Sequence, residues 1–223
     1  RLAGTREGDP QRRDKVRAFA ARFVSAAFRR PLTEAQRKMF VDAFFTKDTQ
    51  PADALKRTVI LALKSPRFLY PDFHSTEPDA HQIAARLALM LWDSVPDRSL
   101  QVAIQNGTLK TPQHIRAQAN RMMRDPRARA KLQHFFHHWL ELDKADAIDK
   151  NAKAFPDFNR RVVADLRQSL RLFLDDTMWA GSGDYRDLLK AGHLFLNDRL
   201  GKFYGAEVTA SGFEKISLGP NRR

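Results

Sequence analysis

Apolar residues recur at helical spacing through the first seventy residues of the chain. Between residues 11 and 30 one side of the predicted helix is apolar, and it consists of Val16, Phe19, Ala20, Phe23 and Ala27. Residues three or four apart share a helix face, so this pattern predicts an amphipathic helix. The basic residues of the same stretch lie largely on its other sides.

Two further helices are predicted before residue 70. Thr33 and Gln36 have the spacing of a capping box, so a helix is expected to begin at Thr33. Another is expected to follow Pro51 and to end at Ser65-Pro66, because the residue before a proline avoids helical geometry. The apolar stripes of these two helices are predicted to be Met39, Phe40, Ala43 and Phe44, and then Leu55, Val59, Ala62 and Leu63.

A stretch without periodicity between Tyr70 and Asp79 predicts a linker, so residues 1–75 are expected to form a three-helix unit and residues 76–223 a larger helical domain. The expected inward residues of this domain's first helix are Ile83, Leu87, Met90 and Leu91, and those of its longest helix are Val162, Leu166, Leu170, Phe173 and Thr177. Its helix starts are signalled by Pro78-Asp79, Pro96-Asp97, Thr111-Pro112, Asp125-Pro126 and, for the longest helix, Phe155-Pro156-Asp157. Predicted helix stops lie at Asn106-Gly107 and Gly181, and further caps are predicted at Asp184 and Asn197.

After Gly205, the residues Val208, Phe213 and Ile216 predict a small β-hairpin. The predicted fold class is therefore all-α, with two packed helical units and this C-terminal hairpin. The apolar residues near the end exceed what so short a hairpin buries by itself, so residues 205–223 are expected to need a covering surface. These apolar residues are Phe203, Tyr204, Val208, Phe213, Ile216 and Leu218.

The composition excludes several kinds of chemistry but says less about the fold. The 223 residues are 43% hydrophobic and include no cysteine, which excludes disulfides, covalent haem attachment and thiol nucleophiles in this sequence. The apolar run at residues 87–92 is far shorter than the roughly 20 residues that cross a bilayer, so no membrane span is predicted. The sequence also lacks a nucleophile elbow, a phosphate-binding glycine loop, a zincin helix and a dinucleotide fingerprint.

The formal net charge is +13, and residues 1–70 hold sixteen basic and seven acidic residues, a balance of +9. Such a surface favours nucleic acid, another polyanion or an acidic protein, because its potential attracts each of them. Arg12, Arg13, Arg17 and Arg22 are the predicted interaction residues. Nucleic acid is the least favoured partner, because the aromatic residues of this region lie on predicted core stripes and are not available for stacking on bases.

A series of short motifs follows in order along nearly the whole chain. They are Arg29-Arg30-Pro31-Leu32-Thr33, Ser65-Pro66-Arg67-Phe68-Leu69-Tyr70, Ala85-Arg86-Leu87, Leu91-Trp92, Pro96-Asp97, Arg121-Met122, Asp125-Pro126-Arg127-Ala128, Phe135, Trp139-Leu140, Phe155-Pro156, Phe195-Leu196-Asn197, Arg199-Leu200 and Tyr204-Gly205. The series resembles the paired domains of unknown function in large secreted proteins of planctomycetes and related bacteria, many of which carry a c-type cytochrome segment. The resemblance implies a periplasmic or extracellular location and the middle of a longer polypeptide. It implies no cofactor in this chain, with haem c in a neighbouring segment or a partner, and it carries over no set of catalytic residues, which stay unknown.

Four residues, His134, His137, His138 and Glu141, share one face of a predicted helix and form the candidate metal site. Two histidines at positions i and i+4 can bind zinc, nickel or copper. At about 100° per residue the apolar side of this helix lies opposite the histidines, so they are expected to face solvent or a partner, and a solvated polar face is the simpler interpretation. The apolar side is predicted to hold Leu132, Phe135, Phe136 and Trp139.

The other titratable residues are interpreted as structural or solvated. Asp143, Asp146, Asp149, Asp175 and Asp176 are interpreted as solvated, and Arg86 and Arg199 as members of ion pairs. Haem binding through Met90, Met122 or Met123 is weighed against core packing, which is the ordinary role of helical methionines.

Three functions follow from the sequence. The leading one is a non-catalytic helical interaction or scaffold module whose partners are other modules of the same polypeptide or a protein subunit. The second is part of an enzyme or of a haem or metal redox component whose active site is completed by neighbouring modules. The third is a basic nucleic-acid-binding domain.

Overall fold

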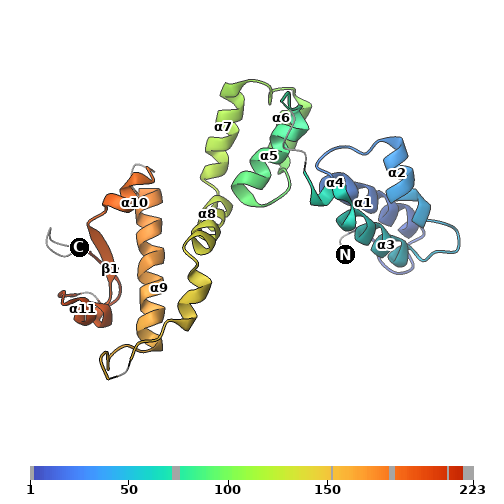
Figure 1. The fold of residues 1–223 in the computed structure, drawn as a ribbon. Helices are drawn as coiled ribbons and strands as arrows, with labels where there is room; N and C mark the ends of the chain where they lie inside the picture. Colours follow the sequence, from blue (N-terminus) through green and yellow to red (C-terminus); the bar gives the residue numbers. More distant parts are fainter. Residues whose placement is uncertain (1–2, 72–75, 152, 181–183, 210, 218–223) are drawn as a thin grey trace. The chain divides into compact units, whose positions relative to one another are not determined.

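The computed structural model describes residues 3–71, 76–151, 153–180, 184–209 and 211–217 (Figure 1). It is mostly helical, with one small two-stranded sheet, which confirms the all-α fold class. By internal contacts the chain divides into an N-terminal unit, Arg1–Lys131, and a C-terminal unit, Leu132–Arg223. This division falls within helix α8 (Pro126–Trp139), whereas a boundary at residue 75 remains a prediction from composition.

The N-terminal unit begins with α1 (Arg12–Ala27), α2 (Glu34–Phe40), the 3₁₀ helix η1 (Asp42–Phe44), α3 (Pro51–Lys64) and α4 (Pro66–Leu69). Their buried core contains Ala20, Val24, Phe28, Phe40 and Val41, and the rings of Phe28 and Phe40 meet edge to face at 4.9 Å. Thr33 caps α2 in the predicted capping box with Gln36.

Two predicted stripes of this region are partly wrong. In the second helix Met39 and Ala43 are exposed, because α2 ends at Phe40 and the following 3₁₀ turn changes the phase of the side chains. In α3 the predicted core residue Leu63 is exposed, and the buried positions are Ala54, Thr58 and Ala62. Small side chains on that face allow α3 to lie close against α1, its main neighbour.

The rest of the N-terminal unit comprises α5 (Ala80–Trp92), α6 (Arg98–Gln105), α7 (Pro112–Met123) and the first part of α8. Asp79, Asp97 and Thr111 cap α5, α6 and α7, as their sequence signals predict, and Gly107 adopts a positive φ after α6. The core-facing prediction for Met90 is wrong, because α5 buries Ala84, Ala85, Ala88 and Trp92.

The C-terminal unit contains η2 (Leu142–Ala147), α9 (Arg160–Asp175), a π-helical turn η3 (Asp176–Ala180), α10 (Arg186–Lys190), β1 (His193–Leu196), α11 (Asp198–Tyr204) and β2 (Glu214–Ser217). The longest predicted helix begins later than expected. Asn159 caps α9 by accepting the amide hydrogens of Arg161 and Val162, so Phe155 and Pro156 precede the helix. The predicted stop at Gly181 lies outside the described residues.

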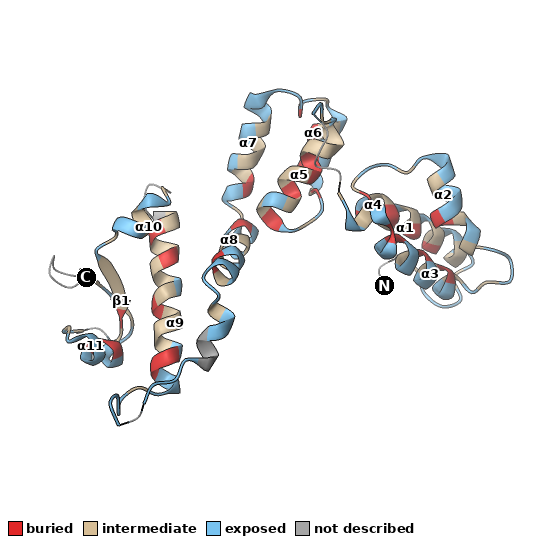
Figure 2. Ribbon diagram, in the orientation of Figure 1, coloured by how far each residue is buried: buried red, intermediate tan, exposed pale blue. Residues whose placement is uncertain are grey.

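The sheet pairs β1 and β2 antiparallel, with His193 opposite Ser217 and Leu196 opposite Glu214. Its first strand precedes α11, so the two strands are separated in sequence by a helix. Val162, Leu196 and Leu200 form the buried centre of this unit, and buried positions recur along α9 (Figure 2). Val208, Phe213 and Ile216 pack against that centre, while Leu218 lies outside the described residues.

Gly201 of α11 provides a test of this packing. A Cβ atom there would lie 2.7 Å from Cγ2 of Val208 and 2.8 Å from the carbonyl oxygen of Ala206. Gly201→Ala is expected to lower the free energy of unfolding by about 1–2 kcal/mol, because overpacking outweighs the better helix propensity of alanine. Chemical denaturation measures this change in the free energy of unfolding. Gly212→Ala, where a Cβ meets nothing within 4 Å, is the control, and an equal effect of both variants would contradict the close approach.

Candidate functional site

The predicted interaction arginines of α1 differ in what they contact. Arg13 donates hydrogen bonds to the carbonyl oxygens of the turn after η1, including that of Thr49 at 2.9 Å. Arg17 pairs with Asp42 at 2.9 Å, and Arg12 lies 3.9 Å from Glu7. Arg22 is exposed. Arg13 and Arg17 therefore hold α1 to the segment between α2 and α3.

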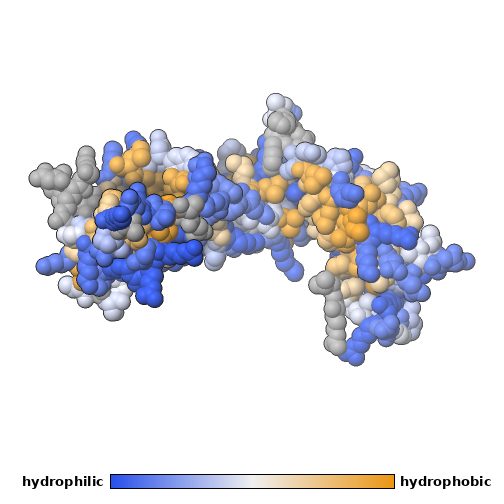
Figure 3. All heavy atoms as spheres, turned by 60° about the horizontal axis from the view of Figure 1, so that its bottom comes forward, coloured by the Kyte–Doolittle hydropathy of each residue, from blue (hydrophilic) through white to orange (hydrophobic). Residues whose placement is uncertain are grey.

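The outer face of α3 combines apolar and basic side chains, and we define it by Lys56, Arg57, Ile60, Leu63 and Lys64. All five are exposed, and Ile60 is 59% exposed. Lys56 and Lys64 lie one turn on either side of Ile60, on the side of α3 away from its buried alanines. Figure 3 shows apolar side chains gathered on the N-terminal helices with charged side chains beside them.

Sequence reasoning missed this face because it assigned Leu63 to the core. A usable signal was present, since Ala54, Thr58 and Ala62 recur every four residues and already define the buried stripe. Once that stripe is recognised, Ile60 and Leu63 must point away from it.

Two residues of the candidate metal site are brought together. The Nε2 atoms of His134 and His138 lie 3.1 Å apart, and the two rings meet edge to face with centroids at 4.5 Å. Both side chains are exposed, as the pattern predicts.

The other two residues of that candidate set have separate contacts. Nδ1 of His137 lies 3.4 Å from Asp143, and the carboxylate of Glu141 lies 2.6 Å from Lys144. Glu141 follows the end of α8 and has φ of 52°, so it does not continue the helical face. Among the described residues no group of three or more metal-ligating side chains is gathered.

The predicted apolar side of α8 is only partly buried. Phe136 is buried, whereas Phe135 and Trp139 are exposed and stack on each other with ring centroids at 5.7 Å. The expectation that both belong to the core is therefore wrong. The helical repeat locates the apolar arc correctly, but burial needs a neighbouring element over the whole arc.

The remaining candidates have mainly structural surroundings. Asp175 accepts hydrogen bonds from Gln133, and Arg199 lies 3.3 Å from Asp165. Asp149 is exposed, and the side chain of Asp146 lies outside the described part of the chain. Arg86 is half-buried with its Nε atom inaccessible. Of the methionines weighed for haem, Met122 is buried, while Met90 and Met123 are exposed, contrary to the core-packing expectation.

A pocket of about 310 Å³ lies in the C-terminal unit where the π-helical turn meets the sheet. Asp176 lies 2.6 Å from Nζ of Lys215 and 3.2 Å from Nε2 of His193, whose ring packs against Phe173. Lys190 also lines the pocket. An imidazole beside a carboxylate can exchange a proton, and the carboxylates of Asp176 and Asp187 balance the two lysines of the lining, so its charge does not select an anion. Sequence reasoning missed this pocket because pairing of the strands brings its residues together.

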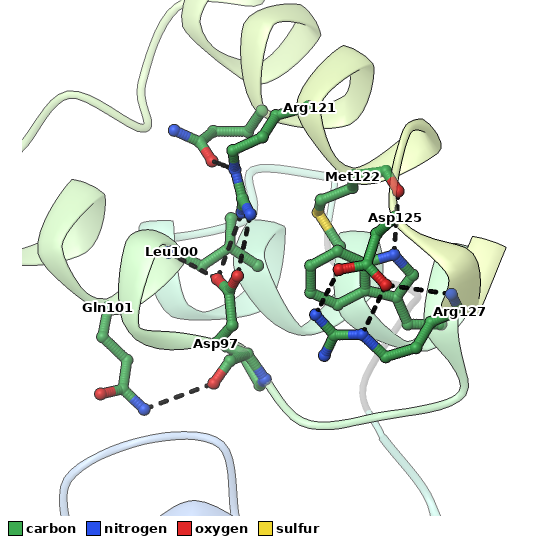
Figure 4. A network of polar contacts seen from close by, with 10 residues as sticks. Asp97, Leu100, Gln101, Arg121, Met122, Asp125 and Arg127 are labelled. Atoms are coloured by element: carbon green, nitrogen blue, oxygen red, sulfur yellow. Dashed lines mark hydrogen bonds and ion pairs between the residues drawn. The ribbon is translucent and has the colours of Figure 1, made fainter.

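Four motifs of the series, those that contain Trp92, Asp97, Arg121 and Arg127, meet in a network in the N-terminal unit (Figure 4). Asp97 accepts the amide hydrogen of Leu100 and pairs with the guanidinium of Arg121 through two hydrogen bonds of 2.9 and 3.2 Å. The guanidinium of Arg127 lies 3.5 Å from the centre of the Trp92 ring. Hydrogen bonds from Arg127 lower the pKa of Asp125 to about 2. These contacts join α5, α6, α7 and the start of α8, so these motifs have a structural role.

Two family models of unknown function match the chain, which confirms the resemblance to paired domains of unknown function. A family model described as "PSD4: Protein of unknown function (DUF1592)" matches residues 79–206. A second, described as "PSD5: Protein of unknown function (DUF1595)", matches residues 15–71. Neither a curated protein nor a solved structure was found to match the chain. Across the described residues, every helix is too short or too polar to span a bilayer.

Proposed function

We propose that this chain, which belongs to the family of proteins of unknown function DUF1592, is a non-catalytic helical interaction module of a larger secreted or periplasmic bacterial protein. The location, and an association with a cytochrome-bearing segment or partner, rest on the resemblance of the motif series. The interaction itself rests on one observation, the outer face of α3.

This face has the composition of a binding surface. An exposed isoleucine with a leucine one turn away offers apolar area, and burying such area contributes roughly 25 cal/mol per Å². Three basic side chains, Lys56, Arg57 and Lys64, surround that apolar centre. Asp53, 3.6 Å from Lys56, is the single acidic residue of α3, so the face keeps a positive balance.

The charge selects the class of partner. A second copy of this chain would bring two basic faces together, and like charges in contact are unfavourable. A nucleic acid would meet aliphatic side chains, on which bases cannot stack. An acidic protein segment with apolar residues at helical spacing satisfies both the apolar centre and its basic surround.

A peptide-binding experiment tests this proposal. The probe is a helical peptide of about 20 residues with leucines at positions i, i+3, i+4 and i+7 and glutamates between them. We expect it to bind the chain, and to bind less tightly as salt rises from about 0.1 M to 1 M, where the Debye length falls from about 10 Å to 3 Å. Ile60→Glu is expected to weaken binding at least about tenfold by removing an apolar anchor and adding a like charge. Calorimetric titration measures both effects.

Met90→Glu is the matched control, because Met90 is 69% exposed on α5 and lies outside the outer face of α3. It is expected to leave peptide binding unchanged. The proposal is wrong if a peptide with lysine in place of glutamate binds equally well, or if Met90→Glu weakens binding as much as Ile60→Glu. A concentration-dependent dimer that Ile60→Glu abolishes would assign the face to self-association instead.

A further inference from the structure

The histidine pair of α8 has the arrangement of a chelating group. His134 and His138 are separated by one helical turn, and their Nε2 atoms converge to 3.1 Å. Both side chains are exposed, so an ion can reach them from solvent. The nearest histidine along the chain, His137, directs its Nδ1 toward Asp143.

We propose that His134 and His138 form a two-imidazole site for a divalent first-row transition-metal ion, with Cu²⁺ bound most tightly. An imidazole nitrogen ligates such an ion at about 2.0–2.1 Å. Two nitrogens 3.1 Å apart both reach one ion at this distance with an N–metal–N angle of about 98°, which lies between the square-planar and the tetrahedral values. The separation of the two nitrogens therefore already suits a shared ion.

The donor set selects the class of metal. Two neutral imidazoles suit copper, nickel and zinc, whereas Ca²⁺ and Mg²⁺ require oxygen ligands. The Glu141 carboxylate is held by Lys144, and the residues described in this structure gather no third ligating side chain here. The other coordination positions are thus left to water or to a group from a partner. Copper ranks first because divalent affinity for nitrogen sites rises from Mn²⁺ to Cu²⁺ and falls at Zn²⁺.

Titration of the untagged chain with Cu²⁺ tests the site, with electron paramagnetic resonance as the second readout. We expect one ion per chain and a spectrum with hyperfine splitting from two imidazole nitrogens. His134→Ala and His138→Ala are each expected to weaken binding at least about tenfold, since one of two protein ligands is lost. Ni²⁺ and Zn²⁺ are expected to bind more weakly than Cu²⁺.

His137→Ala is the matched control, because it removes a histidine of the same helix that faces Asp143. It is expected to leave both the affinity and the spectrum unchanged. Circular dichroism should show full helix content in all three variants, and His134→Asn provides a polar replacement if His134→Ala loses helix. Unchanged Cu²⁺ affinity in both His134→Ala and His138→Ala, or an equal loss in His137→Ala, would overturn the assignment and leave only adventitious binding elsewhere on the chain.

Discussion

Replacing Trp92 with alanine is expected to lower the free energy of unfolding of the N-terminal unit by about 3–5 kcal/mol, the range for truncating a buried large aromatic side chain. Trp92 is 5% exposed at the end of α5. Its Nε1–H donates to the carbonyl oxygen of Met122 at 3.0 Å, and the guanidinium of Arg127 lies over its ring. The variant therefore loses packing, a hydrogen bond and a cation–π contact together. Urea denaturation followed by circular dichroism measures the change.

Two comparisons make this test specific. Trp139→Ala removes the same side chain where it is 60% exposed, and its cost is expected to stay below about 1.5 kcal/mol, the value of an aromatic pair. Trp92→Phe keeps an aromatic ring but loses the donor to Met122, and it is expected to cost about 1 kcal/mol. If Trp92→Ala and Trp139→Ala destabilised the chain equally, the central role of Trp92 would be refuted.

The contacts among Trp92, Asp97, Arg121 and Arg127 also explain why motifs far apart in the sequence occur in the same chain. Pro96-Asp97 supplies the carboxylate, Arg121-Met122 supplies the guanidinium and the carbonyl, and Asp125-Pro126-Arg127 places a second arginine over the Trp92 ring. Each motif is short, but Trp92 and Arg121 reach the partners named above only when the helices pack. A resemblance based on these motifs therefore reports the fold and leaves the activity open.

Helix ends were predictable because their signals are local. Thr33, Asp79, Asp97, Thr111 and Asn197 all accept backbone hydrogen bonds within three residues, as their positions predict. Two predicted starts are displaced. Asn159 caps α9 although Phe155-Pro156-Asp157 offers an earlier start, and the N-cap of α10 is Tyr185, one position after the predicted cap Asp184. A backbone N–H needs a partner wherever a helix begins, and a short polar side chain in the sequence identifies that partner.

The buried faces were less predictable, because burial depends on the neighbouring element. Ranking positions by hydrophobicity assigned Leu63 and Met90 to the core, yet α3 and α5 bury alanines and expose these larger residues. Close helix packing selects small side chains, which a hydrophobic periodicity alone does not favour. The same limit applies to Phe135 and Trp139 on α8.

The two candidate sites, the histidine pair and the pocket, also differ in whether the sequence identifies them. The convergence of His134 and His138 follows from the helical repeat, so the sequence was enough to identify that pair. The pocket around Asp176, His193 and Lys215 required the register of β1 and β2, because the last two residues lie on paired strands. Residues that meet only through strand pairing have no fixed spacing along the chain, so the pattern of a single sequence does not identify them.

The second large effect is expected in the C-terminal unit, where Leu200→Ala should lower the free energy of unfolding by about 2–5 kcal/mol, because the cavity left by a buried leucine closes only in part. Leu200 is fully buried on α11 and meets Leu196 of β1 and Val162 of α9 in one cluster. Urea denaturation and faster amide exchange in α9 and β1 measure the loss. Leu189→Ala, at a leucine 81% exposed on α10, should change stability by less than about 0.5 kcal/mol. Equal effects of the two variants would show that Leu200 does not join these three elements.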